Sequence, residues 1–111
     1  NPQAAQAVVT AFEQASRFIY KHPPEAVTIA HKYFPSLPVA VVQKAVQREI
    51  DAKGYPQNVL VSQQAWDNNM NIALYAKNIK AYPSAATSYQ NNVNTSLATK
   101  AKAAVDAMGD Q

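Results

Sequence analysis

Histidine and carboxylate side chains are the groups in this chain that could bind a metal ion or transfer protons. His22 and His31 lie on opposite sides of a proline break. A zinc site needs three or four convergent ligands, and no third ligand is spaced to join these two histidines. Glu49 and Asp51 are close in sequence, but they point to different sides of a helix. We therefore expect no metal, no cofactor and no pair of acid–base carboxylates.

Other signs of catalysis are missing as well. The chain has no cysteine, which excludes disulfides, thiolate ligands and a cysteine nucleophile. Its two glycines, Gly54 and Gly109, are far apart, so they cannot form a glycine-rich phosphate loop. Serine, histidine and aspartate all occur, but no nucleophile elbow surrounds them. The sequence predicts that the protein is not an enzyme and has no catalytic residue.

Three aromatic residues could line a ligand pocket, namely Trp66, Tyr82 and Tyr89. An aromatic residue at helical spacing is more often part of the core, where it buries a large area, and we expect this of Trp66. For Tyr82 and Tyr89, packing and a wet surface both stay open. No ligand-binding residue is assigned from the sequence.

Nucleic-acid binding by a helix-turn-helix is an alternative function. The second and third expected helices are joined by a short turn, and the third carries a polar stripe of base-reading and phosphate-binding types, Gln43, Lys44, Gln47 and Arg48. The turn, however, holds Pro35 and Pro38 without a glycine. Ten basic residues against seven acidic ones give a net charge of only +3, and the basic residues are scattered. We therefore expect no nucleic-acid partner.

The elements that position these residues are separated by clear stops, of which the clearest is the Pro23-Pro24 pair. A proline lacks the N–H of a helix interior but is tolerated in a first turn. One helix must therefore end near Lys21, and the next must begin at the prolines. Elsewhere, we expect Ser36 and Ser62 as N-terminal caps and the expected helix ends to lie at Gly54, Asn78 and Gly109.

Helical periodicity extends over almost the whole chain, and the fold class is all-α. The 111 residues predict a single domain, 1–111. We expect five or six helices at about 4–21, 24–34, 38–53, 62–77, 84–90 and 95–108. No apolar run approaches the roughly 20 residues that cross a bilayer, so no membrane insertion is expected. Because residue 1 is Asn rather than Met and no signal peptide is seen, we expect a chain processed or excised from a longer one.

The apolar positions with helical spacing are expected to face inward. These are Val8, Phe12, Ala15 and Ile19 in the first helix, Ala26, Ile29 or Ala30, and Tyr33 in the second, Val39, Val42, Val46 and Ile50 in the third, Trp66, Met70, Ala73 and Leu74 in the fourth, and Leu97, Ala101, Ala104 and Met108 in the last. Glu13 and Arg17 are spaced for a weak ion pair on the surface.

The order of these features resembles the C-terminal part of periplasmic substrate-binding proteins of the nitrate, sulfonate and taurine type, which are similar to thiamine-precursor-binding proteins. The resemblance covers nearly the whole chain in short motifs. These are Ala11-Phe12-Glu13-Gln14-Ala15, the junction His22-Pro23-Pro24-Glu25-Ala26, the helix containing Ile29-Ala30-His31-Lys32-Tyr33, the helix from Pro38 to Lys53, then Trp66, and Asn78-Ile79-Lys80. His22 stands where the family more often has asparagine, Asn78 where it has glycine, and Asn91 or Asn92 where it has aspartate.

The resemblance implies part of the solute-binding component of an ABC importer. Such proteins are two-lobed and α/β, and they deliver a small solute (a sulfonate, nitrate, taurine or a pyrimidine-like molecule) to a permease from the periplasm. This chain would be the helical C-terminal portion, not itself sufficient for binding, with its partners in the full-length protein. By itself it should expose apolar surface and form a homo-oligomer or a helix-swapped dimer. A free-standing helical protein-interaction module is the other alternative.

Overall fold

The computed structural model describes residues 1–109. Within them the chain forms six helices and no strand, which confirms the all-α fold class. The helices are α1 (Pro2–Lys21), α2 (Pro23–Tyr33), α3 (Val39–Asp51), α4 (Gln63–Tyr75), α5 (Tyr89–Asn92) and α6 (Ser96–Ala107). None of these helices combines the length and the apolar character that a membrane crossing requires.

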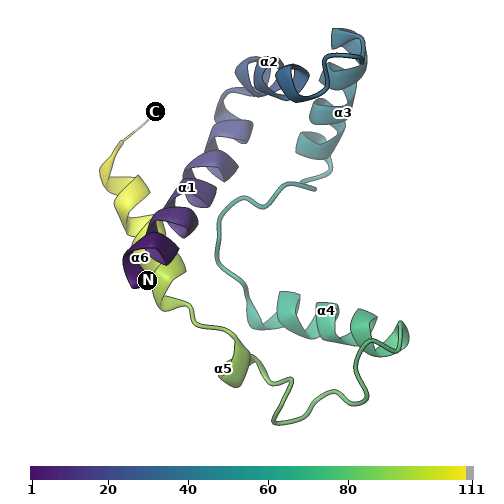
Figure 1. Cartoon of the computed structure of the whole chain (residues 1–111), viewed down its shortest axis with the longest axis vertical. Coiled ribbons are helices and arrows are strands. Elements are labelled where there is room, and N and C mark those ends of the chain that lie inside the picture. The colour runs from purple at the N-terminus through teal and green to yellow at the C-terminus, as the bar shows by residue number, and fades with distance from the viewer. Residues whose placement is uncertain (110–111) are drawn as a thin grey trace.

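The helices form a C-shaped molecule (Figure 1). α1 packs lengthwise on α6 and meets α2 at its end, and α2 packs on α3; we call these four helices the body. α4 and α5 pack on each other and form a separate arm. The radius of gyration is 17.0 Å, whereas a compact domain of this length has about 13 Å. The chain is therefore far more open than an ordinary single domain.

The break at the proline pair is confirmed. α1 ends at Lys21, and α2 begins at Pro23, where the missing N–H costs nothing. His22 lies between them, donates its N–H to the Phe18 carbonyl (2.8 Å), and accepts the first bond of α2 from Ala26 (2.9 Å). Its ring lies 5.0 Å from that of Phe18. The junction therefore turns the chain within one residue.

Of the two expected N-terminal caps, one is confirmed. Ser62 caps α4, because its hydroxyl accepts the N–H of Ala65 at 3.1 Å. The expectation for Ser36 is wrong, since α3 starts at Val39 with Pro38 at the cap position. Pro38 is extended, with ψ at 138°, and its fixed φ already leads the chain into the helix.

The left-handed residues that end α3 and α4 are lysines. Lys53 and Lys77 have φ of 53° and 61°. The left-handed conformation was expected one residue later in each case, at Gly54 and Asn78. The N–H of Gly54 bonds to the carbonyl of Glu49 at 2.8 Å, and the N–H of Asn78 bonds to Ala73 in the same way. This six-to-one bond places the left-handed residue one position earlier. Gly109, with φ of 73°, ends α6 as expected.

The apolar core lies where α1, α2 and α3 meet. Ala26, Val42 and Val46 are buried there, with partly buried residues packed around them, namely Phe18, Ile19, Val27, Ala30 and Ile50. The expected inner residues Tyr33 and Val39 are instead exposed, Tyr33 by 79%. Tyr33 is the last residue of α2 and Val39 the first of α3, so both lie beside the turn between these helices, where helical spacing does not fix which side is buried.

The face of α1 that packs on α6 differs from the expected one. Its buried residues are Glu13 and Ser16, while Val8 and Phe12 are exposed, Phe12 by 64%. The buried residues of α6 are Ala98, Ala101 and Val105, so the expected stripe was right at Ala101 and wrong at Ala104 and Met108. Small residues on α6 allow close approach, and α6 therefore covers the polar side of α1.

The arm has a half-buried interior and no fully buried residue in its helices. The expected helix at 84–90 is wrong, because residues 85–87 form a turn and α5 covers only Tyr89–Asn92. The side-chain amides of Asn91 and Asn92 donate to the carbonyls of Ala85 and Ala86 at 2.8 and 3.0 Å. These bonds give the backbone an alternative to the helix, as asparagine side chains often do.

Candidate functional site

A row of three polar side chains runs along α1 and binds the other parts of the chain. Gln6, Glu13 and Tyr20 are spaced by seven residues, which places them on one face of the helix. Each bonds to the backbone of a distant segment: the carbonyl of Leu97 at 3.0 Å, the N–H of Val59 at 2.9 Å and the carbonyl of Tyr55 at 2.5 Å, respectively. We call these three side chains the polar row.

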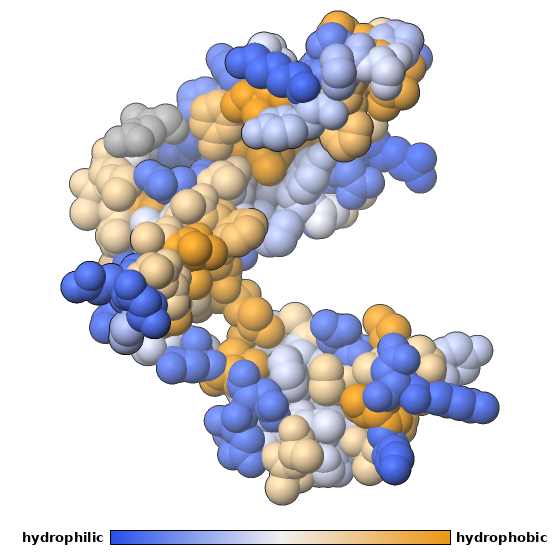
Figure 2. Space-filling model, viewed as in Figure 1, coloured by the Kyte–Doolittle hydropathy of each residue, from blue (hydrophilic) through white to orange (hydrophobic). Residues whose placement is uncertain are grey.

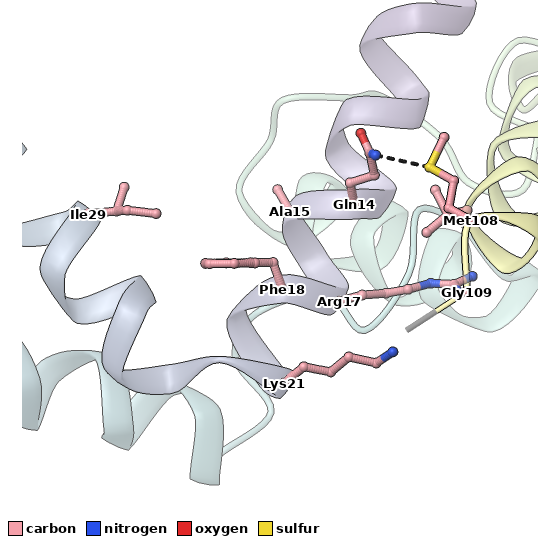
Figure 3. Close-up of a pocket in the computed structure, with 9 residues that line it drawn as sticks. Gln14, Ala15, Arg17, Phe18, Lys21, Ile29, Met108 and Gly109 are labelled. Atoms are coloured by element: carbon pink, nitrogen blue, oxygen red, sulfur yellow. Dashed lines mark hydrogen bonds between the residues drawn. The ribbon is translucent and has the colours of Figure 1, made fainter. Parts of the chain in front are cut away.

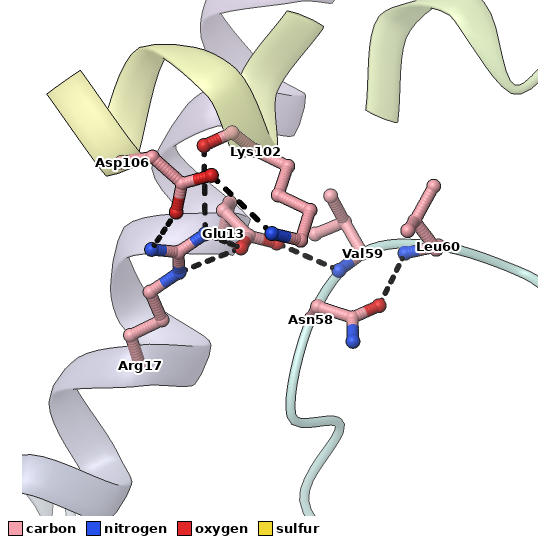
Figure 4. Close-up of polar contacts among 7 residues, drawn as sticks. All are labelled: Glu13, Arg17, Asn58, Val59, Leu60, Lys102 and Asp106. Atoms are coloured by element: carbon pink, nitrogen blue, oxygen red, sulfur yellow. Dashed lines mark hydrogen bonds and ion pairs between the residues drawn. The ribbon is translucent and has the colours of Figure 1, made fainter. Parts of the chain in front are cut away.

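Glu13 is the centre of the polar row and is fully buried, with 0% of its side chain exposed. Its Oε1 accepts from the guanidinium of Arg17 at 2.7 Å, and its Oε2 accepts the N–H of Val59 (Figure 4). The expected ion pair is therefore present, but its description as a weak surface pair is wrong. A buried carboxylate is tolerated only when its oxygens are bonded in this way.

Arg17 links the polar row to α6. Its Nη1 lies 2.6 Å from Asp106 Oδ1, its Nη2 donates to the carbonyl of Lys102 at 3.4 Å, and Lys102 Nζ lies 3.3 Å from Asp106 Oδ2 (Figure 4). Hydrogen bonds to Asp106 and then Glu13 raise the pKa of Arg17. The bond from Arg17, and then that from Lys102, lowers the pKa of Asp106.

The charges of this network balance, since two carboxylates face two cations. The buried carboxylate has both oxygens bonded, and the guanidinium bridges two carboxylates. The arrangement can fix three segments relative to one another, which is a positioning task.

The histidines and carboxylates considered from the sequence do not come together. His31 Nε2 lies 3.1 Å from the carbonyl of Leu37 at the end of α2, and His22 lies at the junction beside Phe18. Asp51 accepts from Gln47 at 2.8 Å. Over residues 1–109, no group of three His, Cys, Asp or Glu residues is placed to hold a metal ion.

The three aromatic candidates lie in the arm and hold its parts together. Trp66 donates its indole N–H to the carbonyl of Thr87 at 2.8 Å, and Tyr89 donates to that of Val61 at 2.7 Å. Tyr82 donates its hydroxyl to Asp67, and this bond is the main cause of a raised pKa of Tyr82. All three side chains are half-buried, so Trp66 packs within the arm without being fully enclosed.

An apolar trough runs along α1, α2, α3 and the end of α6. It consists of three adjoining hollows of about 280, 270 and 450 Å³, and its lining includes Phe18, Ile29, Ala30, Phe34, Val46 and Tyr55. In the first hollow, Phe18 reaches from α1 toward Ile29 of α2, and Gln14 donates to the sulfur of Met108 (Figure 3). Sequence spacing left Ile29 and Ala30 as alternatives for the inward position; Ala30 is partly buried against the core, whereas Ile29 is about half exposed.

A separate hollow of about 430 Å³ lies where the arm joins the body, and we call it the root hollow. Val9 and Phe12 of α1 form one side of it, and Val59, Leu60 and Val61 form the other. Figure 2 shows apolar residues gathered in this region and around α2 and α3. The trough and the root hollow both present apolar surface to solvent.

Comparison with known proteins gives no relative. No protein family matches this chain, and neither a curated protein nor a solved structure matches it.

Proposed function

We propose that this chain is the helical C-terminal part of the solute-binding component of an ABC importer, and that it is not by itself sufficient to bind the solute. The observation that carries the proposal is the surface that the helices leave uncovered. The chain exposes 8073 Å², whereas a compact monomer of 12.1 kDa exposes about 6,000 Å². The excess of about 2,000 Å² corresponds to the surface that one large interface would bury.

The uncovered surface is apolar and contiguous with the small core. Ile29, Phe34 and Val41 are each about half exposed along the trough, and Phe12 and Leu60 are exposed at the root hollow. Monomeric proteins rarely present such patches unless something binds there. A helical layer that packs against an adjoining α/β lobe would present such faces.

The helix order also supports the proposal. The junction motif opens α2, Trp66 lies in the first turns of α4, and Asn78 directly follows the left-handed residue that ends this helix. These three motifs therefore fall near helix starts and ends, where proline, a large apolar residue and asparagine each suit the local backbone.

The solute is a small organic or inorganic molecule of the sulfonate, nitrate, taurine or pyrimidine kind, which is bound between the lobes in the periplasm and passed to a permease in the membrane. No residue of this chain is assigned to the solute, since strand ends and helix N-termini of the lobes supply most contacts in that family. This places the present helices in a supporting role.

Calorimetry on two proteins tests the proposal. The chain on its own should give no binding heat with taurine, an alkanesulfonate, nitrate or a pyrimidine, whereas the full-length polypeptide should bind one of them. Tight binding by the isolated chain would refute the supporting role. A full-length polypeptide without α/β lobes ahead of residue 1 would refute the family assignment.

A free-standing helical interaction module is the second candidate, because the apolar trough would suit it equally. The polar stripe of α3 is exposed, so DNA binding by a helix-turn-helix is a further alternative to test. The stripe consists of Gln43, Lys44, Gln47 and Arg48. Binding to a random DNA duplex, measured at low and at high salt, distinguishes the helix-turn-helix from the interaction module. DNA binding through phosphate contacts weakens steeply as the salt concentration rises. We expect no binding at either salt concentration.

A further inference from the structure

The arm is joined to the body through two short connections. Residues 52–62 lead from α3 to α4, and residues 93–95 lead from α5 to α6. The helices of the arm pack mainly on each other, and those of the body pack on one another. Little helix–helix packing connects the arm to the body. The contacts made by the two connections, which we call the roots of the arm, therefore set the orientation of the arm relative to the body.

All three members of the polar row act at these roots. Glu13 and Tyr20 bind the outgoing connection at Val59 and Tyr55, and Gln6 binds α6 at Leu97, just after the return connection. Of these bonds, the one from Glu13 lies nearest to α4 in the sequence and is the one made by a buried charge. A hydrogen bond to a charged group contributes more than a neutral one.

We propose that Glu13 is a latch: its bond to the Val59 N–H holds the arm at a fixed angle to α1, and the arm turns about residues 55–62 and 93–95 when that bond is lost. Glu13 is thus a positioning residue. The inference rests on the contacts of this chain alone and is independent of the proposed function.

The charge network allows the latch to open without unfolding the body. When the charge of Glu13 is removed, Arg17 keeps its short pair with Asp106 and its bond to the carbonyl of Lys102. α1 and α6 therefore remain joined, and the buried apolar residues of α6 still pack on α1. The energetic cost falls mainly on the Val59 N–H, which is left without its acceptor.

Opening the latch changes the root hollow. One wall of this hollow belongs to α1, through Val9 and Phe12, and the other belongs to the connection that the latch holds, through Val59, Leu60 and Val61. When the connection leaves α1, the two walls separate, and the apolar side chains that are already partly exposed there become more accessible. The latch therefore controls how much apolar surface is offered beside the arm.

Distance measurements between spin labels test this device, and the absence of native cysteine makes labelling specific. One label is placed on the arm by Asn71→Cys and one on α6 by Lys100→Cys, both at exposed positions. The parent should give one narrow distance distribution. Glu13→Gln, which cannot accept fully from both Arg17 and Val59, should broaden it about twofold or add a second distance.

Val59→Pro provides the matched test, because proline removes the donor N–H and leaves every charge in place. It should broaden the distribution as Glu13→Gln does, and the double variant should be no broader than either single one. Glu25→Gln changes an exposed glutamate of α2 and should leave the distribution narrow. A second label pair on α3 and α6, at Lys44 and Lys100, reports on the body.

Three results would overturn the proposal. The first is an unchanged arm distance in both Glu13→Gln and Val59→Pro. The second is a parent distribution that is already broad, because the latch would then hold nothing. The third is a shift of the Lys44–Lys100 distance or a loss of helical circular dichroism in Glu13→Gln, which would make Glu13 an ordinary structural residue of the body.

Discussion

At the scale of single residues, the hydrogen-bonded charged side chains around Arg17 fix the positions of α6 and of the connection to the arm relative to α1. Arg17 bridges Glu13, which is fully buried, and Asp106, whose side chain is half exposed. The two carboxylates that pair with Arg17 therefore differ in environment and in role. Glu13 orders the interior next to the arm, and Asp106 ties α6 to α1 at a surface that solvent and protons reach.

Asp106 should make the attachment of α6 sensitive to acid. Because its pKa is lowered in the folded chain, its contribution to stability is present above the unfolded pKa of about 4 and is lost as the pH falls through the lower folded value. Asp106→Asn should therefore melt at a lower temperature than the parent at neutral pH, and this gap should close at lower pH.

Thermal melts at a series of pH values, followed by circular dichroism, measure that gap. Glu25→Gln is the control, since it removes a carboxylate on the exposed side of α2. A gap that stays constant from neutral pH to about pH 2, well below the usual aspartate pKa, would contradict the role given to Asp106.

Tyr82 should ionise at a higher pH than an ordinary tyrosine does. Its bond to Asp67 and its partial burial raise its pKa above the usual value near 10, so this bond stabilises the arm below pH 10 and is lost as the pH rises through the folded pKa. An alkaline titration followed by tyrosinate absorbance should show a late step among the six tyrosines. Asp67→Asn should remove the late step, and identical curves for the two proteins would refute the assignment.

Part of this residue-scale behaviour was predictable. The spacing of Glu13 and Arg17 predicted their ion pair, because residues four apart are neighbours on any helix. Its burial was not predictable, since it depends on where α6, more than eighty residues further along the chain, packs. The seven-residue repeat of Gln6, Glu13 and Tyr20 was visible in the sequence, but three different polar types on a helix usually indicate a solvated face.

At the scale of elements, the starts and ends of helices were more predictable than their buried faces. The proline pair, Ser62 and Gly109 act through local backbone chemistry and were correct. The buried faces depend on tertiary packing, and for that reason Val8, Phe12 and Tyr33 were placed inward wrongly. Asn91 and Asn92 lie in α5 and bond back to the turn before it, which shortens the expected helix at 84–90.

The lysines that end α3 and α4 offer a direct test of this local chemistry. Lys53 and Lys77 have left-handed backbones, which cost an L-residue about 1 kcal/mol relative to glycine. Lys53→Gly and Lys77→Gly should therefore stabilise the chain by up to about 1 kcal/mol. Gly109→Ala, at φ of 73°, should destabilise it by a similar amount.

Urea denaturation measures these differences, and Lys44→Gly is the matched control because it makes the same exchange inside α3. That change should destabilise the chain by about 1 kcal/mol, through the poor helix propensity of glycine. If Lys53→Gly were as destabilising as Lys44→Gly, the left-handed assignment of Lys53 would be wrong.

At the scale of the whole molecule, the open shape leaves the trough unpaired. The isolated chain should therefore associate with itself, and a symmetric dimer is the simplest closed arrangement. Ile29→Gln together with Phe34→Gln should weaken this association at least about tenfold, since each removes roughly 1 kcal/mol or more of apolar burial. Both side chains are about half exposed in the single chain, so its fold should survive.

Analytical ultracentrifugation over a range of concentrations measures the association. Tyr75→Gln serves as the control, because Tyr75 is 91% exposed on the arm and lies outside the trough. A parent chain that remains monomeric at high concentration would show that the trough does not drive association. An equal effect of the Tyr75 change would show that the trough is not the contact surface.

The long-range bonds of the polar row should form late in folding. Its three bonds close loops of 91, 46 and 35 residues, all from one helix that is synthesised before its partners. Each helix can form locally within about a microsecond, whereas the bonds of α1 must wait for distant segments to arrive. We therefore expect α1 to form early and its bonds to distant segments to form late. Its buried carboxylate stays in water until the chain has folded around it.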